Sequence, residues 1–251
     1  MITVARLCRY PVKGLNAEDL AEVSLTAGAG LPEDRRFAIA HGSTRFDNDG
    51  PAWKPKDSFL TLKRNERLGR LHTDYDAASG MLTIHRDGKR VARGDLTAPL
   101  GRQLIEQFLA AFLGDEARGA PKIVAAPAVS FTDTRENYVS IINLASAADI
   151  ERVVRQPIDP LRFRGNIYLD GATAWREASW PGRNLRIGGA TMRVVEAIGR
   201  CAATNIDPAT GIRDLNIPKA LMDGFRHTEC GVYAEVIKDG TVTVGCEVEL
   251  L

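Results

Sequence analysis

The chain has 251 residues, of which 44% are hydrophobic and 26% charged, a composition typical of a globular protein with one or two domains. Its 33 basic and 32 acidic residues give a net charge of +1, so no overall field directs it to nucleic acid or to an anionic membrane. The first twenty residues lack the apolar core of a signal peptide, and no apolar run reaches the ~18 residues of a membrane span. We therefore expect a cytoplasmic enzyme or binding protein.

Short segments of strand-like composition, separated by turn residues, dominate the first hundred residues. They are 2–12, 21–27, 35–42, 58–64, 70–76 and 81–91. Asp87-Gly88 lies between two extended runs and predicts a type I′ hairpin. An amphipathic helix follows from Leu100 to Leu113, because its apolar residues recur with helical period and Gly114 can end it.

The second half of the chain repeats the strand pattern after a polar, Gly- and Pro-containing stretch at 115–122. Strands are expected at 137–143, 166–171, 184–189 and 190–201. Ser146 is a plausible N-cap for a helix that stops before Pro157, and Pro218 can begin a second short helix. The last segment, 231–250, predicts two strands paired around Asp239-Gly240. Strands this short and closely spaced favour an antiparallel, barrel-like fold with a few covering helices.

The cysteines leave two interpretations open. The four of them form no C-x-x-C pair, which disfavours a zinc ribbon or a self-contained iron–sulfur cluster. In the stretch 199–211, GRCAATNIDPATG, Cys201 follows Arg200 where a strand runs into a turn. A cation beside a thiol can favour the thiolate, a nucleophile or soft metal ligand, whereas the alternative is a small buried apolar residue. Nucleotide-binding glycine motifs, H-E-x-x-H and G-x-S-x-G are absent.

Four segments in order resemble the MOSC family, named after the C-terminal part of molybdenum cofactor sulfurases. They are YPVKGL with LPEDRRFAIA (10–15 and 31–40), INLASAADI (142–150), RFRGNIYLDG (162–171) and the stretch 199–211 with the closing strands. The resemblance is weakest from 43 to 94. It implies a mainly β protein, with an N-terminal β-barrel module at 1–95, a connecting helix at 96–119 and a MOSC-type β-barrel domain at 120–251.

The resemblance also implies a bound molybdenum–molybdopterin cofactor with Cys201 as the metal ligand. An anionic cofactor needs local cations and hydrogen-bond donors, because the net charge supplies no attraction. The positions that match family binding residues are Lys13, Gly14, Arg35, Asn143, Ser146, Arg164, Asn166, Arg200 and Tyr233. Gly14 replaces a serine of many relatives, which removes a hydroxyl but keeps a backbone N–H.

Two-module members of the family, among them the mitochondrial amidoxime-reducing component, imply a molybdenum-dependent oxidoreductase that reduces small N- or S-oxygenated compounds. No flavin, nicotinamide or iron–sulfur motif is present, so electrons would come from separate redox proteins. Two alternatives stay open: a sulfur carrier that uses a persulfide on Cys201, and a non-catalytic cofactor-binding protein.

Overall fold

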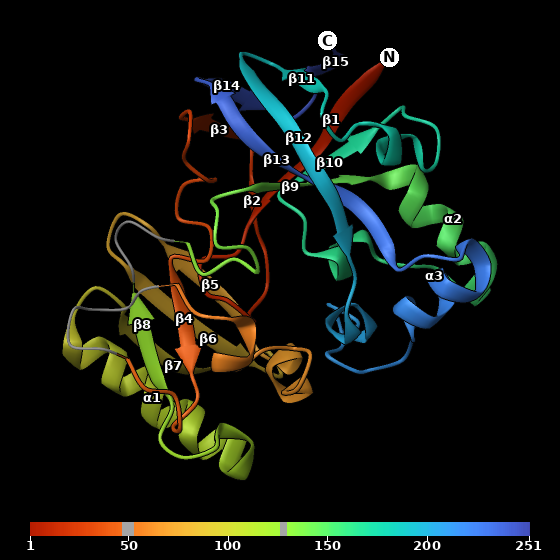
Figure 1. Ribbon diagram of the computed structural model, residues 1–251. Coiled ribbons are helices and arrows are strands. Elements are labelled where there is room, and N and C mark those ends of the chain that lie inside the picture. The colour runs from red at the N-terminus through yellow and green to blue at the C-terminus, as the bar shows by residue number, and fades with distance from the viewer. Residues whose placement is uncertain (47–52, 126–129) are drawn as a thin grey trace.

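The computed structural model describes residues 1–46, 53–125 and 130–251 as two packed modules of different size (Figure 1). The larger is a β-barrel with two covering helices, and the smaller is built on two small sheets and one long helix. The predicted fold class, mainly β with a few helices, is confirmed. No helix in the described residues has the length and apolarity to cross a membrane.

The barrel is a closed ring of seven strands. Going round the ring, the order is β10-β9-β13-β12-β11-β15-β1, and β1 pairs with β10 to close it. Only β9 and β10 run parallel in the ring. The strands are β1 (Ile2–Arg9), β9 (Val139–Asn143), β10 (Ile167–Asp170), β11 (Asn184–Ile187), β12 (Ala190–Gly199), β13 (Glu229–Lys238) and β15 (Glu247–Leu250). Their alternating apolar side chains fill the interior, with Leu7, Ile141, Ile167, Met192 and Val232 each at most 1% exposed.

The N-terminal strand of the chain, β1, is part of the barrel. β1 pairs with β10 and, at Ile2 and Thr3, with β15, while β2 (Glu18–Leu20) pairs with the later part of β1, from Leu7 to Arg9. In space, therefore, β1 and β2 belong to the barrel sheet, although in the sequence they precede the smaller module, whose core also contains Val12 and Leu15. The boundaries drawn from the sequence at 95 and 120 stay a prediction, since they describe chain order rather than packing.

The predicted hairpin around Asp239-Gly240 is wrong. β13 ends at Lys238, but β14 (Gly240–Thr243) leaves it and pairs with β3 (Glu22–Leu25) in a separate two-stranded sheet. Asp239 Oδ1 accepts a hydrogen bond from Ala27 N at 2.8 Å, which binds the turn to β3 instead. The Asp239-Gly240 turn thus connects β13 of the barrel sheet to β14 of the separate two-stranded sheet.

Two helices cover one end of the barrel. α2 (Leu144–Val154) begins two residues before the predicted cap, because Asn143 rather than Ser146 is the N-cap and accepts from Ala145 N at 3.1 Å. α3 (Ile217–Phe225) is capped by Asn216 and has Pro218 in its first turn, as predicted.

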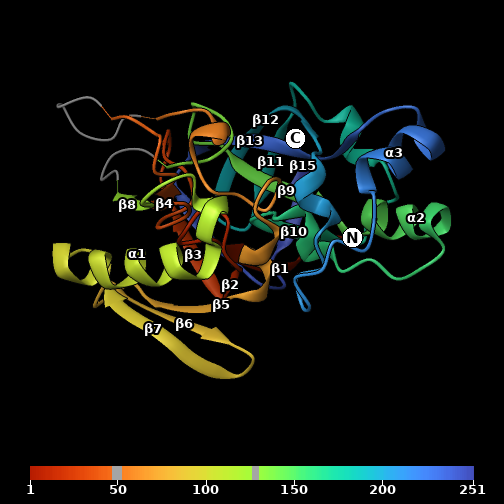
Figure 2. The same ribbon diagram turned by 90° about the horizontal axis from the view of Figure 1, so that it is seen from below.

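The smaller module packs α1 (Pro99–Leu113) against a three-stranded sheet (Figure 2). That sheet contains β5 (His72–Asp76), β6 (Met81–Arg86) and β7 (Lys89–Asp95), and β4 (Phe37–Ala40) pairs with β8 (Lys122–Ala125) beside it. The hairpin at Asp87-Gly88 is confirmed, since both residues have positive φ, 51° and 72°.

Short 3-10 helices complete the fold of both modules: η1 (Lys56–Ser58), η2 (Glu66–Arg70), η3 (Gly114–Ala117), η4 (Pro160–Phe163), η5 (Arg176–Ser179) and η6 (Ala202–Asn205).

The predicted strand at 58–64 is not formed. Only Phe59 makes an isolated bridge, to Ala40, and Leu60 N donates to Ile39 O at 2.8 Å. The chain then turns at Thr61 and runs along the barrel module, which places this loop at the junction of the two modules.

Candidate functional site

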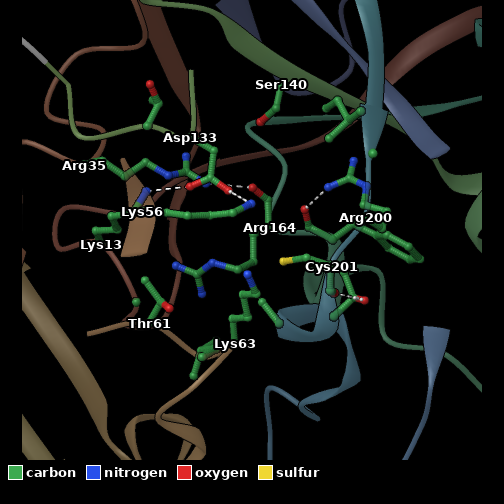
Figure 3. A pocket seen from close by; sticks show the side chains of 18 of the residues that line it. Lys13, Arg35, Lys56, Thr61, Lys63, Asp133, Ser140, Arg164, Arg200 and Cys201 are labelled. Carbon is green, nitrogen blue, oxygen red and sulfur yellow. Dashed lines mark hydrogen bonds and ion pairs between the residues drawn. The ribbon is translucent and has the colours of Figure 1, made fainter. Parts of the chain in front are cut away.

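A cavity of about 120 Å³ lies where the two modules meet; we call it the junction cavity. Its walls come from both modules and bring together residues from distant parts of the sequence (Figure 3). All but two of the predicted site residues line it: Lys13, Gly14, Arg35, Arg164, Asn166, Arg200, Cys201 and Tyr233.

Cys201 follows the end of β12 and is the only one of the four cysteines that lines the junction cavity. Its backbone is extended, and its carbonyl accepts hydrogen bonds from Thr204 N at 3.1 Å and Thr204 Oγ1 at 2.9 Å. This anchors the turn of η6 and leaves the side chain free. The thiol is partly exposed and points into the cavity (Figure 3).

Arg200 does not direct its charge at the neighbouring thiol. Its Nε donates to Cys230 O at 2.7 Å and its Nη1 donates to Phe163 O at 2.8 Å. The guanidinium therefore joins the end of β12 to β13 and to η4. Its role is to fix the loop that carries Cys201, and other cations face the cavity.

Lys13 and Lys56 both pair with Asp133. Lys13 Nζ lies 2.6 Å from Asp133 Oδ1 and 2.8 Å from Phe131 O, and Lys56 Nζ lies 3.1 Å from Asp133 Oδ2. Burial lowers the pKa of Lys13, and the Asp133 carboxylate opposes that shift. Burial opposes ionisation of Asp133 in turn, yet the two lysines hold its pKa well below the usual range. The group is thus a fixed, charged cluster on one wall.

Arg35 and Arg164 stack on Tyr10. Their guanidinium carbons lie 4.4 and 4.3 Å from the centre of the Tyr10 ring. Arg35 pairs with Asp34 and donates to Arg164 O at 2.9 Å, so its charge is balanced. Within residues 1–46, 53–125 and 130–251, no side-chain or backbone acceptor bonds to the Arg164 guanidinium. Burial lowers the pKa of Arg164, so it is a desolvated cation available to an anionic ligand.

Asn166 and Tyr233 complete the barrel side of the cavity. Asn166 Oδ1 accepts from Ser140 N at 3.1 Å and Ser140 Oγ at 2.7 Å, while Nδ2 donates to Cys8 O at 3.2 Å. The Asn166 side chain therefore braces β1 and β9 against each other. Tyr233 lies opposite Ser140 in the β13–β9 pair and is half-buried.

Gly14 is required by the backbone of this chain. Its φ is +90°, and a Cβ built there would lie 2.9 Å from Leu60 O. A serine at this position would be strained and would push the 59–62 loop away. The glycine thus brings that loop close to the cavity while its own N–H remains.

Asn143 and Ser146 do not line the junction cavity. Asn143 Nδ2 donates to Glu177 Oε2 at 2.8 Å and to Thr173 O at 2.8 Å, and Ser146 Oγ donates to Glu177 Oε2 at 2.9 Å. Both side chains are buried and bond to one oxygen, Oε2, of the buried Glu177 carboxylate at the start of α2. The cofactor-binding role predicted for these two residues has no support in their positions.

Several cavity residues were not predicted from the sequence. Lys56, Thr61 and Lys63 come from the 43–94 segment, where the family resemblance is weakest, Asp133 comes from the connection between β8 and β9, and Ser140 comes from β9. The lysines and arginines clustered in 54–64 were the available signal, but charge runs in loops usually face solvent. Residues 47–52 of the same segment lie outside the described part of the chain.

The fold and the site define a two-module β-barrel protein. Its junction cavity is rich in cations and contains one accessible thiol, that of Cys201. A model of the MOSC domain matches residues 122–249, and a model of the MOSC N-terminal beta barrel domain matches residues 1–121. The chain therefore belongs to the MOSC family, and the resemblance read from its motifs is confirmed.

Among curated proteins, the chain is similar to mitochondrial amidoxime reducing component 2 of Bos taurus, with 30% identity over 119 residues that cover 43% of this chain and 35% of the relative. It is also similar to mitochondrial amidoxime-reducing component 1 of Homo sapiens, with 28% identity over 135 residues, 49% of this chain and 39% of the relative. The matches thus span less than half of these relatives.

Among solved structures, the chain is similar to the YUAD protein of Bacillus subtilis, with a TM-score of 0.45 and 12% identity over 100% of this chain and 96% of that one. YiiM of Escherichia coli matches with a TM-score of 0.34 and 16% identity, over 100% of this chain and 68% of that one.

Proposed function

We propose that the chain binds a molybdenum–molybdopterin cofactor in the junction cavity and reduces N-oxygenated compounds there. The observation that carries the proposal is the placement of Cys201, a partly exposed thiol in a cavity lined by Lys56, Lys63 and Arg164. Membership of the MOSC family and the names of the mammalian relatives point in the same direction.

The residues fit such a cofactor in two respects. A thiolate is a soft ligand suited to a metal that already carries sulfur ligands, and Cys201 is accessible to the cavity. The cofactor carries a phosphate, and Arg164 is a cation that lines the cavity, stacks on Tyr10 and pairs with no carboxylate among the described residues. Lys13 and Arg35 already have carboxylate partners, so they fix the wall of the cavity, and the group of Lys13, Lys56 and Asp133 keeps one positive charge in excess.

When bound, the metal centre would supply the two-electron chemistry. Converting an N–OH group to N–H requires two electrons and two protons and releases one water. The electrons would come from a separate redox protein, since no cofactor motif in the sequence supplies them. The chain itself would fix the site: Arg200 and Thr204 hold the Cys201 loop, and the smaller module covers one side of the cavity.

The test is metal content and turnover in matched cysteine variants. Protein made in a host that loads a control molybdenum enzyme should carry about one molybdenum per chain, and Cys201→Ala should abolish turnover of an amidoxime with reduced viologen as the electron donor. Cys246→Ala is the control, because Cys246 is also partly exposed but lies outside the cavity. Trace molybdenum in wild-type protein, or full turnover in Cys201→Ala, would contradict the proposal.

The same preparation distinguishes the two alternatives. A sulfur carrier would hold cyanide-labile sulfur on Cys201 and would oxidise no viologen when substrate is added. A binding protein would retain the cofactor and show neither signal.

A further inference from the structure

A second cavity, of about 210 Å³, adjoins the junction cavity at the module interface; we call it the apolar cavity. Five residues line both cavities: Gly14, Leu62, Arg162, Arg164 and Ala203. Ala203 lies in η6, two residues after Cys201. The boundary between the cavities is therefore close to the accessible thiol.

The lining of the apolar cavity contrasts with that of the junction cavity. Its wall is formed mainly by hydrocarbon side chains: Leu15, Leu62, Leu68, Leu71, Ala203 and Ile206. Transfer of an aryl or alkyl group from water to such a surface is favourable. The apolar cavity thus offers contact area to a ligand, whereas the junction cavity offers charge.

The polar residues of the apolar cavity are mostly bonded to the protein. Asn16 Oδ1 accepts from Thr73 N and Thr73 Oγ1, each at 2.6 Å, and Asn16 Nδ2 donates to Ala17 O at 3.0 Å. Arg162 is paired with Asp207 at 2.9 Å and Asp214 at 2.8 Å. An apolar group could therefore enter without breaking these bonds.

The walls of the apolar cavity are fixed across the module interface. Gly69 packs so closely that a Cβ there would lie 2.8 Å from Ile206 Cγ2 and 2.9 Å from Gly211 Cα. Arg213 bridges the same interface, with Nη1 donating to Ala202 O at 2.7 Å and Nη2 donating to Leu62 O at 3.1 Å. The cavity is preformed, so binding would require little reorganisation.

We propose that the apolar cavity binds the hydrocarbon body of the substrate, an aryl or branched alkyl group, while its N–O group lies in the junction cavity beside Cys201. Arg164 stands in the wall common to both cavities, where the polar and apolar parts of such a molecule would meet. This inference rests on the proposed function and names its substrate class: amidoximes and related N-hydroxy compounds with an apolar body.

The test uses two substitutions at residues that line the apolar cavity and not the junction cavity. Ala17 is partly buried and lines the apolar cavity but not the junction cavity, so Ala17→Phe would occupy space needed by an aryl group. Ala209→Phe is the matched control, because Ala209 is exposed on the adjacent turn and lines neither cavity. His72→Trp is a second filling variant at an exposed residue of the same cavity and so spares the core.

Binding of benzamidoxime and acetamidoxime to the full chain, with and without cofactor, is measured by calorimetry in the absence of an electron donor. Wild-type protein should prefer benzamidoxime. Ala17→Phe and His72→Trp should weaken benzamidoxime binding about tenfold or more and acetamidoxime binding little, because a pocket gains affinity mainly from buried apolar groups. Ala209→Phe should match wild type in both.

Unchanged benzamidoxime affinity in both filling variants would overturn the proposal. So would loss of cofactor from Ala17→Phe, because the apolar cavity would then belong to the cofactor. Turnover with reduced viologen separates this inference from the proposed function. Selective binding without turnover in loaded protein supports the cavity and contradicts the activity. Turnover that neither filling variant alters supports the activity and contradicts the cavity.

Discussion

At the scale of single residues, burial divides the cysteines into two pairs. Cys8 and Cys230 are each at most 2% exposed, and burial raises the pKa of both thiols to about 12. At pH 8 their thiolate fraction should therefore be about one in ten thousand. Cys201 and Cys246 are partly exposed.

We expect iodoacetamide at pH 8 to modify Cys201 and Cys246 in the folded protein and to leave Cys8 and Cys230 unmodified, as read by peptide mass spectrometry. All four should react in denaturant. Early modification of Cys230 in folded protein would show that the region between η5 and β13 opens more readily than its burial implies.

Asp133 gives the site a pH dependence. Lys13 and Lys56 lower the pKa of this carboxyl in the folded state, against the effect of burial, whereas the unfolded value is near 4. The ion pairs of Asp133 with the two lysines therefore stabilise the fold above about pH 4. That contribution is lost as the pH falls from there towards the folded-state pKa of Asp133. Because the Asp133 side chain is 41% exposed, solvent screens the interaction.

Asp133→Asn should lower the free energy of unfolding by about 1 kcal/mol at pH 7, measured by urea denaturation, and the difference from wild type should shrink below about pH 4. Asp115→Asn, at an exposed carboxylate outside the cavity, is the control. A difference that grows on acidification would contradict the charge pairing.

At the scale of elements, Asn143 contributes to the stability of α2, and its predicted role in cofactor binding can be tested separately. Its side chain caps α2 and also donates to the buried Glu177. Asn143→Ala removes the cap and one hydrogen-bond donor to a buried carboxylate, and we expect a loss of about 2–4 kcal/mol of stability with unchanged cofactor content per folded chain. Molybdenum analysis of the folded fraction provides the second measurement. Cofactor loss without a loss of stability would restore the binding role.

The elements differ in how far the sequence alone determines them. α1 and the hairpin at Asp87-Gly88 were predictable, because helical periodicity and positive-φ turn residues act over a few neighbours. The turn at Asp239-Gly240 carries the same local signal, but β14 pairs with β3 near the other end of the chain. No local pattern specifies that pairing.

The residues of the candidate site likewise fall into those that the sequence predicts and those that only the packed structure reveals. Lys13, Arg35, Arg164 and Cys201 stand in recognisable motifs, so their convergence on one cavity could be anticipated from the sequence. Lys56 and Lys63 could not, because they enter through a loop that reaches the cavity only when the two modules pack. Which cations are already paired is likewise a property of the packed structure.

At the scale of the whole molecule, the two modules approach each other closely at two glycines, Gly69 and Gly211. A methyl group on Gly69 would meet Ile206 and Gly211 at less than 3 Å. We expect Gly69→Ala to lower stability by about 1–3 kcal/mol and to increase hydrogen exchange in 61–69 and 201–206, since the interface must open to admit it. Gly199→Ala is the matched control, because its Cβ would have no neighbour within 4 Å. Equal stability of the two variants would contradict a tight interface.

The closure of the barrel by β1 has a consequence for the order of folding. β1 precedes the smaller module in the chain, whereas its partners β10 and β15 both follow that module. Contacts between such distant segments form slowly, because a long loop must close before they gain any stability. During synthesis the smaller module can fold while β1 still lacks these partners. A chaperone that shields β1 until residues 247–250 emerge would therefore increase the yield of native protein more than one that acts after synthesis.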